Sequence, residues 1–218
     1  MQINEISMAL WIIFFVFSGI FGILLTRKAF KPEFERPQRE YYLGIAIFIF
    51  IHIVARISYY YYDFIDAQEL YWELGALIGI GSVIFLIYAI ERHIYTRSKF
   101  IITIIATINL TVLLIITIVN FMNPGFISPD IKLIIQIINT AVIGLFIPLI
   151  YLYVAIKSSS TYRRNSLLIA IGIIIFLGGQ TAHNRGFFIP DNILYFILSP
   201  TLMLIGGVIF LYGLLKPA

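Results

Sequence analysis

Long apolar stretches separated by short polar segments dominate the chain. A helix that crosses a bilayer needs about 20 predominantly apolar residues, and the hydropathy pattern contains seven stretches suited to such helices. They cover residues 6–26, 42–62, 70–90, 100–120, 131–155, 167–182 and 193–215. The pattern therefore predicts an all-α, polytopic membrane protein in which residues 1–218 form a single seven-transmembrane-helix bundle.

Positively charged residues alternate between the two sides of this predicted bundle. Twelve of the fifteen Lys and Arg residues follow the first, third, fifth or seventh stretch, only Lys132 and Arg185 lie on the opposite side, and Arg56 lies deep within a stretch. Because cytoplasmic loops are rich in Lys and Arg, we expect a multi-pass protein of the cell membrane with an extracellular N-terminus and a cytoplasmic C-terminus. The net charge of +4 is then a topology signal, so the expected partner is the lipid bilayer and not nucleic acid.

The amino-acid composition excludes several kinds of functional site. The chain is 61% hydrophobic and 12% charged, whereas soluble domains carry about 25% charged residues. Cysteine is absent, which excludes disulfides, thiolate metal sites and cysteine nucleophiles. Three scattered histidines do not supply a metal site, and we expect neither catalytic residues nor enzymatic activity. We also expect no cofactor, because residues 193–215 contain no lysine and a retinal Schiff base is therefore excluded.

Arg56 is the clearest charged residue within a predicted span, in the outer half of residues 42–62. Such residues are expensive in a membrane and usually have a partner and a function. His52 and Tyr60 lie four residues before and after it and share its helix face, while Glu73 or Glu69 of the next stretch is the expected counter-ion. Two interpretations remain open: a buried ion pair that pins two helices, or the anchor of a binding site.

Polar residues of other stretches fall in the same, outer half once the predicted orientation is applied. The inner halves of several stretches are almost purely aliphatic. This asymmetry predicts a pocket open to the outside that binds a small polar or anionic ligand, with Arg56 holding the anionic group. The expected ligand-binding residues are Arg56, His52, Tyr60, Glu73, Gln136, Asn139, Gln180 and His183.

A faint internal similarity links the two halves of the chain. Residues 43–47 resemble 167–171 at an offset of 124, and residues 83–86 match 208–211 at an offset of 125. A 3+1+3 parallel repeat would explain both. Chance similarity between isoleucine-rich helices is the alternative, and both stay open.

Three segments carry a resemblance to a known class of membrane protein: residues 88–95 (YAIERHIY), 151–157 (YLYVAIK) and 163–168 (RRNSLL). In these the chain resembles a family of archaeal seven-span proteins, similar to the membrane sensor modules of archaeal histidine kinases. The resemblance implies a receptor-like or sensory protein that signals through a separate cytoplasmic protein, because this chain carries no kinase. The alternative is a small-solute transporter or channel using the same cavity, although its inner half lacks a polar lining.

Overall fold

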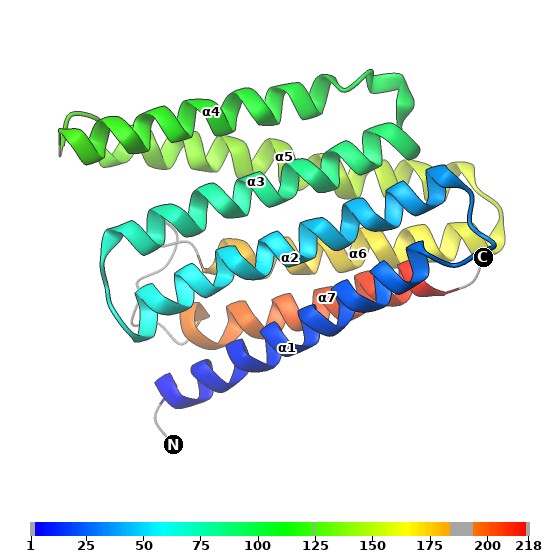
Figure 1. Cartoon of the computed structure of the whole chain (residues 1–218), viewed down its shortest axis with the longest axis horizontal. Coiled ribbons are helices and arrows are strands. Elements are labelled where there is room, and N and C mark those ends of the chain that lie inside the picture. The colour runs from blue at the N-terminus through cyan, green and yellow to red at the C-terminus, as the bar shows by residue number, and fades with distance from the viewer. Residues whose placement is uncertain (1–2, 124, 184–193, 217–218) are drawn as a thin grey trace. The chain divides into compact units, whose positions relative to one another are not determined.

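The described part of the chain is helical throughout. The computed structural model describes residues 3–123, 125–183 and 194–216, and side chains within these ranges except 129, 130, 132, 133, 136–143, 160 and 194. The α-helices are α1 (Ile3–Ala29), α2 (Arg36–Phe64), α3 (Glu69–His93), α4 (Ile101–Met122), α5 (Pro129–Lys157), α6 (Ser160–Ala182) and α7 (Ser199–Leu215). A 3₁₀ turn (η1, Thr96–Ser98) precedes α4, and a π-helical turn (η2, Leu194–Leu198) leads into α7 (Figure 1).

Within the described ranges, six helical segments are long and apolar enough to cross a membrane. They are α1, α2, α3, α4, Thr161–Ala182 and Tyr195–Leu215, and the described part of α5 adds a shorter apolar segment, Gly144–Lys157. The expectation of an all-α, multi-pass membrane protein is confirmed. The fifth span, the orientation and the repeat stay predictions.

The second helix begins six residues before its predicted start, at Arg36. The backbone N–H of Glu35 donates to Gln38 Oε1 at 3.3 Å, and the Glu35 side chain accepts from the Gln38 backbone, which together form a capping box. Pro37 occupies the first turn, where its fixed φ favours a helix start. The polar flank of this apolar stretch is therefore helical as well.

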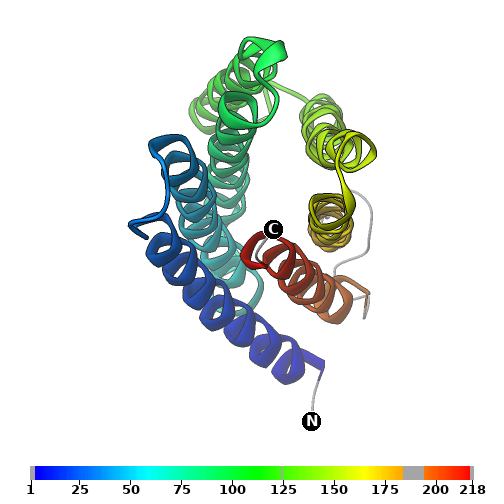
Figure 2. The ribbon, with the colours of Figure 1, turned by 90° about the vertical axis from the view of Figure 1, so that its right-hand side faces the viewer.

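The helices pack in two compact units, one formed by Met1–Ser18 with Gly144–Ala218 and the other by Gly19–Ile143. In the second of these units, α2 and α3 lie side by side along their length (Figures 1 and 2). Small residues allow this approach: a Cβ built on Gly44 would lie 2.6 Å from the Ala89 Cβ, and one on Gly79 would lie 3.7 Å from the Ala55 Cβ.

The fourth helix packs on α3 through a narrow stripe. Its buried residues are Ala106, Leu113 and Ile116, while most of its other large apolar side chains are exposed. Apolar side chains that face lipid carry no penalty, so a thin contact stripe is sufficient in a membrane. The position of α4 on α3 therefore depends strongly on polar contacts.

Glu91 provides one of these contacts, at the start of α4. Its side chain is 1% exposed and accepts hydrogen bonds from the backbone N–H groups of Ile102 (3.1 Å) and Thr103 (2.8 Å) and from the Thr103 hydroxyl. The first N–H groups of a helix lack intrahelical partners and attract anions. Glu91 thus caps α4 from α3, across a connection in which Lys99 and Phe100 adopt left-handed backbone angles (φ 48° and 63°).

In the unit formed by Met1–Ser18 and Gly144–Ala218, α6 and α7 lie side by side in backbone contact (Figures 1 and 2). Gly172 and Gly179 of α6 face Gly206 and the Met203 backbone of α7. A Cβ on Gly179 would lie 2.8 Å from both the Met203 N and the Ser199 O. Glycine is therefore required here by contact between two backbones.

Candidate functional site

Arg56 begins a chain of hydrogen bonds that joins α2 to α3. Its side chain is 2% exposed, and its Nε–H donates to His52 Nε2 at 3.2 Å. His52 Nδ1 lies 3.3 Å from Ser82 Oγ, and the Ser82 hydroxyl donates to the Gly79 carbonyl at 2.6 Å. One proton arrangement satisfies all three bonds: a neutral His52 protonated on Nδ1 that accepts at Nε2 and donates to Ser82. The chain of bonds therefore assigns the tautomer of His52.

Tyr59 lies against the guanidinium and was missed by the sequence analysis. The guanidinium carbon of Arg56 is 5.1 Å from the centre of the Tyr59 ring, a cation–π geometry. The Tyr59 ring in turn makes an edge contact with Trp72 of α3, with ring centres 4.8 Å apart. Tyr60, the predicted neighbour, contacts Phe64 at 5.0 Å, and its ligand-binding role stays a prediction. Residues at i+3 and i+4 share a helix face, so spacing alone did not separate the two tyrosines.

Glu73, the expected counter-ion of Arg56, also links α3 to α4. The Thr117 hydroxyl of α4 donates to Glu73 Oε2 at 3.1 Å. Glu69, the other candidate, lies 3.5 Å from the Tyr62 hydroxyl. The pairing of Arg56 with Glu73 stays a prediction. The Glu73 carboxylate also has a structural role, because it binds α4 through Thr117.

The predicted ligand-binding residues are divided between the two compact units of the chain. Gln180 and His183 belong to the unit of α6 and α7, whereas His52, Arg56, Tyr60 and Glu73 belong to the unit Gly19–Ile143. Gln136 and Asn139 belong to α5, and their side chains lie outside the described residues. A single pocket that contains the whole set stays a prediction.

His183 lies in an aromatic cluster at the end of α6. Its ring stacks on Tyr195 with centres 4.5 Å apart and meets the Trp11 ring edge-on at 5.2 Å. All three residues are almost fully buried. Trp11 and Tyr195 were missed because they lie in two other apolar stretches, whose packing against α6 the sequence does not specify.

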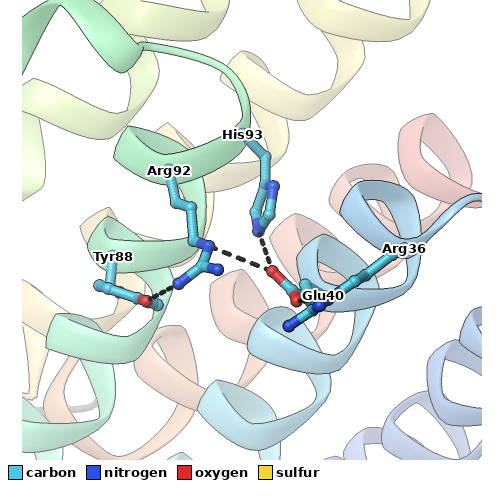
Figure 3. A network of polar contacts seen from close by, with 5 residues as sticks. All are labelled: Arg36, Glu40, Tyr88, Arg92 and His93. Atoms are coloured by element: carbon cyan, nitrogen blue, oxygen red, sulfur yellow. Dashed lines mark hydrogen bonds and ion pairs between the residues drawn. The ribbon is translucent and has the colours of Figure 1, made fainter.

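A third polar group, the Glu40 network, lies at the other end of α2 and α3 (Figure 3). Glu40 Oε1 accepts from Arg36 Nε at 2.8 Å, and its Oε2 lies 3.1 Å from Arg92 Nε and 3.7 Å from His93 Nε2. Arg92 also donates to the Tyr88 hydroxyl. The i, i+4 spacing of Arg36 and Glu40 is a recognisable signal, whereas the contacts with Arg92 and His93 depend on how α2 and α3 pack.

Substituting Glu40 by glutamine is expected to lower the melting temperature only slightly, and less at 1 M salt than at low salt. The carboxylate and Arg92 are both partly exposed (30% and 41%), and exposed ion pairs contribute little and are screened by salt. Thermal unfolding of the purified protein at both salt concentrations measures this. Glu33→Gln, which removes the exposed Lys31–Glu33 pair, is the matched control. A large, salt-independent fall for Glu40→Gln would contradict the prediction.

Among the described residues, no group of three or more His, Asp or Glu side chains is arranged to hold a metal ion. Three clusters of polar or aromatic side chains stand out among the described residues: the chain of bonds at Arg56, the cluster at His183 and the Glu40 network. Comparison of the chain with known protein families, with curated proteins and with solved structures finds no match.

Proposed function

We propose that the protein is a receptor-like or sensory seven-helix membrane protein that binds a small anionic or polar ligand at Arg56. The observation that carries the proposal is a guanidinium only 2% exposed within a membrane helix and oriented by His52 and Tyr59. Buried charges in membrane helices are costly and mark functional sites. His52 accepts as a neutral imidazole and Tyr59 offers a ring face, so both contacts orient the guanidinium without neutralising it.

The chemistry of a guanidinium indicates the class of ligand. Its N–H groups form a rigid fork that matches the two oxygens of a carboxylate or phosphate. His52 accepts from the Nε–H of this fork. A ligand carboxylate or phosphate at Arg56 would therefore compete with the Glu73 carboxylate for the same cation.

The same two helices offer a route for a signal. A ligand that shifts Arg56 acts on His52 and, through it, on Ser82 of α3. Such a change in α2–α3 packing would reach the Glu40 network at the opposite end of these helices (Figure 3). With the predicted orientation, Arg56 lies in the outer half and the Glu40 network faces the cytoplasm, where a separate signalling protein would bind.

Arg56→Met is expected to abolish stabilisation by small anions. A thermal-shift screen of the purified protein against carboxylates and phosphates should identify compounds that raise the melting temperature. At 100 times Kd, a ligand stabilises its protein by about 2.7 kcal/mol. Arg97→Met, at an exposed position outside the helices that hold Arg56, is the control and should keep the response. Equal responses of both variants would contradict a site at Arg56.

The transporter alternative makes a different prediction for the same variant. Counterflow of candidate solutes in proteoliposomes tests it directly. Robust uptake by the unmodified protein that Arg56→Ala abolishes would replace the receptor proposal by a transporter. Binding without counterflow supports a receptor.

A further inference from the structure

The aromatic cluster at His183 is accompanied by buried polar atoms that lack hydrogen bonds. They are Nε1 of Trp11, Oε1 of Gln180 and Oγ of Ser199, and for none of them does the described part of the chain supply a hydrogen-bond partner. Trp11 is 1% exposed and Ser199 is fully buried. A buried polar group without a partner costs about 1–3 kcal/mol, so three in one cluster call for an explanation.

Helix packing brings these three atoms into the same region. Gly179 of α6 is in backbone contact with Ser199 of α7. His183, four residues after Gly179, stacks on Tyr195, four residues before Ser199. Gln180 lies between Gly179 and His183 in α6. Trp11 of α1 covers the His183 ring. The indole donor, the amide acceptor and the hydroxyl thus come from α1, α6 and α7, the three helices that carry or adjoin the residues of this aromatic stack.

The backbone at this point is also unusual. The turn Leu194–Leu198, directly before Ser199, is π-helical, and π-helical turns frequently lie at functional sites. The Ser7 hydroxyl of α1 donates to the Phe196 carbonyl in this turn at 2.5 Å. This bond joins α1 to the π-helical turn at a point one helical turn before Trp11, whose indole contacts His183.

We propose that this cluster is a second binding site, for a small uncharged molecule that carries both a hydrogen-bond acceptor and a donor, such as a primary amide or an alcohol. The Trp11 N–H donates to the ligand oxygen, and Gln180 Oε1 accepts from the ligand N–H or O–H. The Ser199 hydroxyl serves either role. The site excludes ions, because none of its side chains carries a permanent charge and burying an unpaired ion costs far more than burying an amide.

The internal similarity of the chain relates this site to the one at Arg56. At the offset of 124 residues, Arg56 corresponds to Gln180 and Tyr59 corresponds to His183. If the two halves derive from a duplication, the same two positions carry a guanidinium with an aromatic ring in one unit and an amide with an imidazole in the other. The change from cation to amide accounts for an anion site in one unit and a neutral site in the other. The second site does not depend on the function proposed for Arg56.

The two tryptophans of the chain, Trp11 and Trp72, provide a direct test. In a Trp72→Phe background, the only indole N–H resonance in a ¹H–¹⁵N spectrum of the detergent-solubilised protein comes from Trp11. Titration with acetamide is expected to shift this resonance saturably. N,N-dimethylacetamide, which has no N–H to donate to Gln180, should bind at least tenfold more weakly.

Variants of α6 locate the contact. Gln180→Leu is expected to weaken acetamide binding about tenfold, the loss of one hydrogen bond of about 1.4 kcal/mol. Thr181→Val, whose hydroxyl bonds to Leu177 O within the helix, is the neighbouring control and should bind acetamide normally. Unchanged melting temperatures verify that both variants fold.

The proposal fails if acetamide causes no saturable shift, which is the result expected when only water, or another part of the chain, bonds to the indole. It also fails if Gln180→Leu binds acetamide as well as the unmodified protein. The readout is the Trp11 resonance with a neutral ligand, whereas the Arg56 site is tested by anion-dependent melting. The two outcomes are therefore independent.

Discussion

Gly206→Ala is expected to lower the free energy of unfolding by about 1–3 kcal/mol, the usual cost of forcing additional atoms into a packed interface. A Cβ on this residue would lie 2.7 Å from the Gly172 O and 2.8 Å from the Phe176 Cα of α6. Both are backbone atoms, so no side-chain rotation relieves the overlap, and α6 and α7 must separate. Thermal unfolding should show the loss as a fall of roughly 2–12 °C for a protein of this size.

The adjacent glycine supplies the control. A Cβ on Gly207 meets nothing within 4 Å, and alanine in a helix interior is favoured over glycine by roughly 0.5–1 kcal/mol. Gly207→Ala should therefore unfold at the same or a higher temperature. If both alanine variants unfold alike, close backbone contact does not determine the packing of α6 on α7.

Glu91→Ala is expected to destabilise the protein by about 2–5 kcal/mol. The substitution leaves the N–H groups of Ile102 and Thr103 and the Thr103 hydroxyl without their acceptor. These donors are part-buried, so each costs less than the full penalty of about 1–3 kcal/mol for a buried unsatisfied donor. It also removes a negative charge from the N-terminus of α4, where the helix dipole favours one. Thermal unfolding gives the total loss, and hydrogen exchange should localise it to the first turn of α4.

Glu91→Gln separates the two contributions. Its amide oxygen still accepts a hydrogen bond, so the loss should be smaller than for alanine. Glu33→Ala, in an exposed ion pair, serves as the control for removal of a carboxylate. The capping role of Glu91 is excluded if Glu91→Ala and Glu33→Ala unfold at the same temperature.

The apolar stretches alone were sufficient to predict the helical fold, because each span is defined by its own composition. The same reasoning placed the end of the third stretch at residue 90, whereas α3 continues to His93 and Glu91 is buried. Glu91 is buried because the chain reverses through left-handed Lys99 and Phe100, a backbone choice that the hydropathy pattern does not report.

In the candidate site, too, the sequence predicted contacts within one helix but not contacts between helices. His52 was predicted correctly as a neighbour of Arg56 because i, i+4 contacts are properties of one helix. Ser82 was missed because its contact with His52 depends on the register of α2 against α3. Trp11 and Ser199 were missed because they meet α6 only through the packing of α1 and α7 against it.

The polar contacts between α3 and α4 have a consequence for how the chain tolerates change. Glu91 holds the start of α4, and Glu73 holds Thr117 near its end. A slip of one helical turn, about 5.4 Å, breaks both bonds together. We therefore expect the exposed surface of α4 to accept almost any apolar substitution, whereas inserting or deleting a single residue between Thr103 and Thr117 would be disruptive.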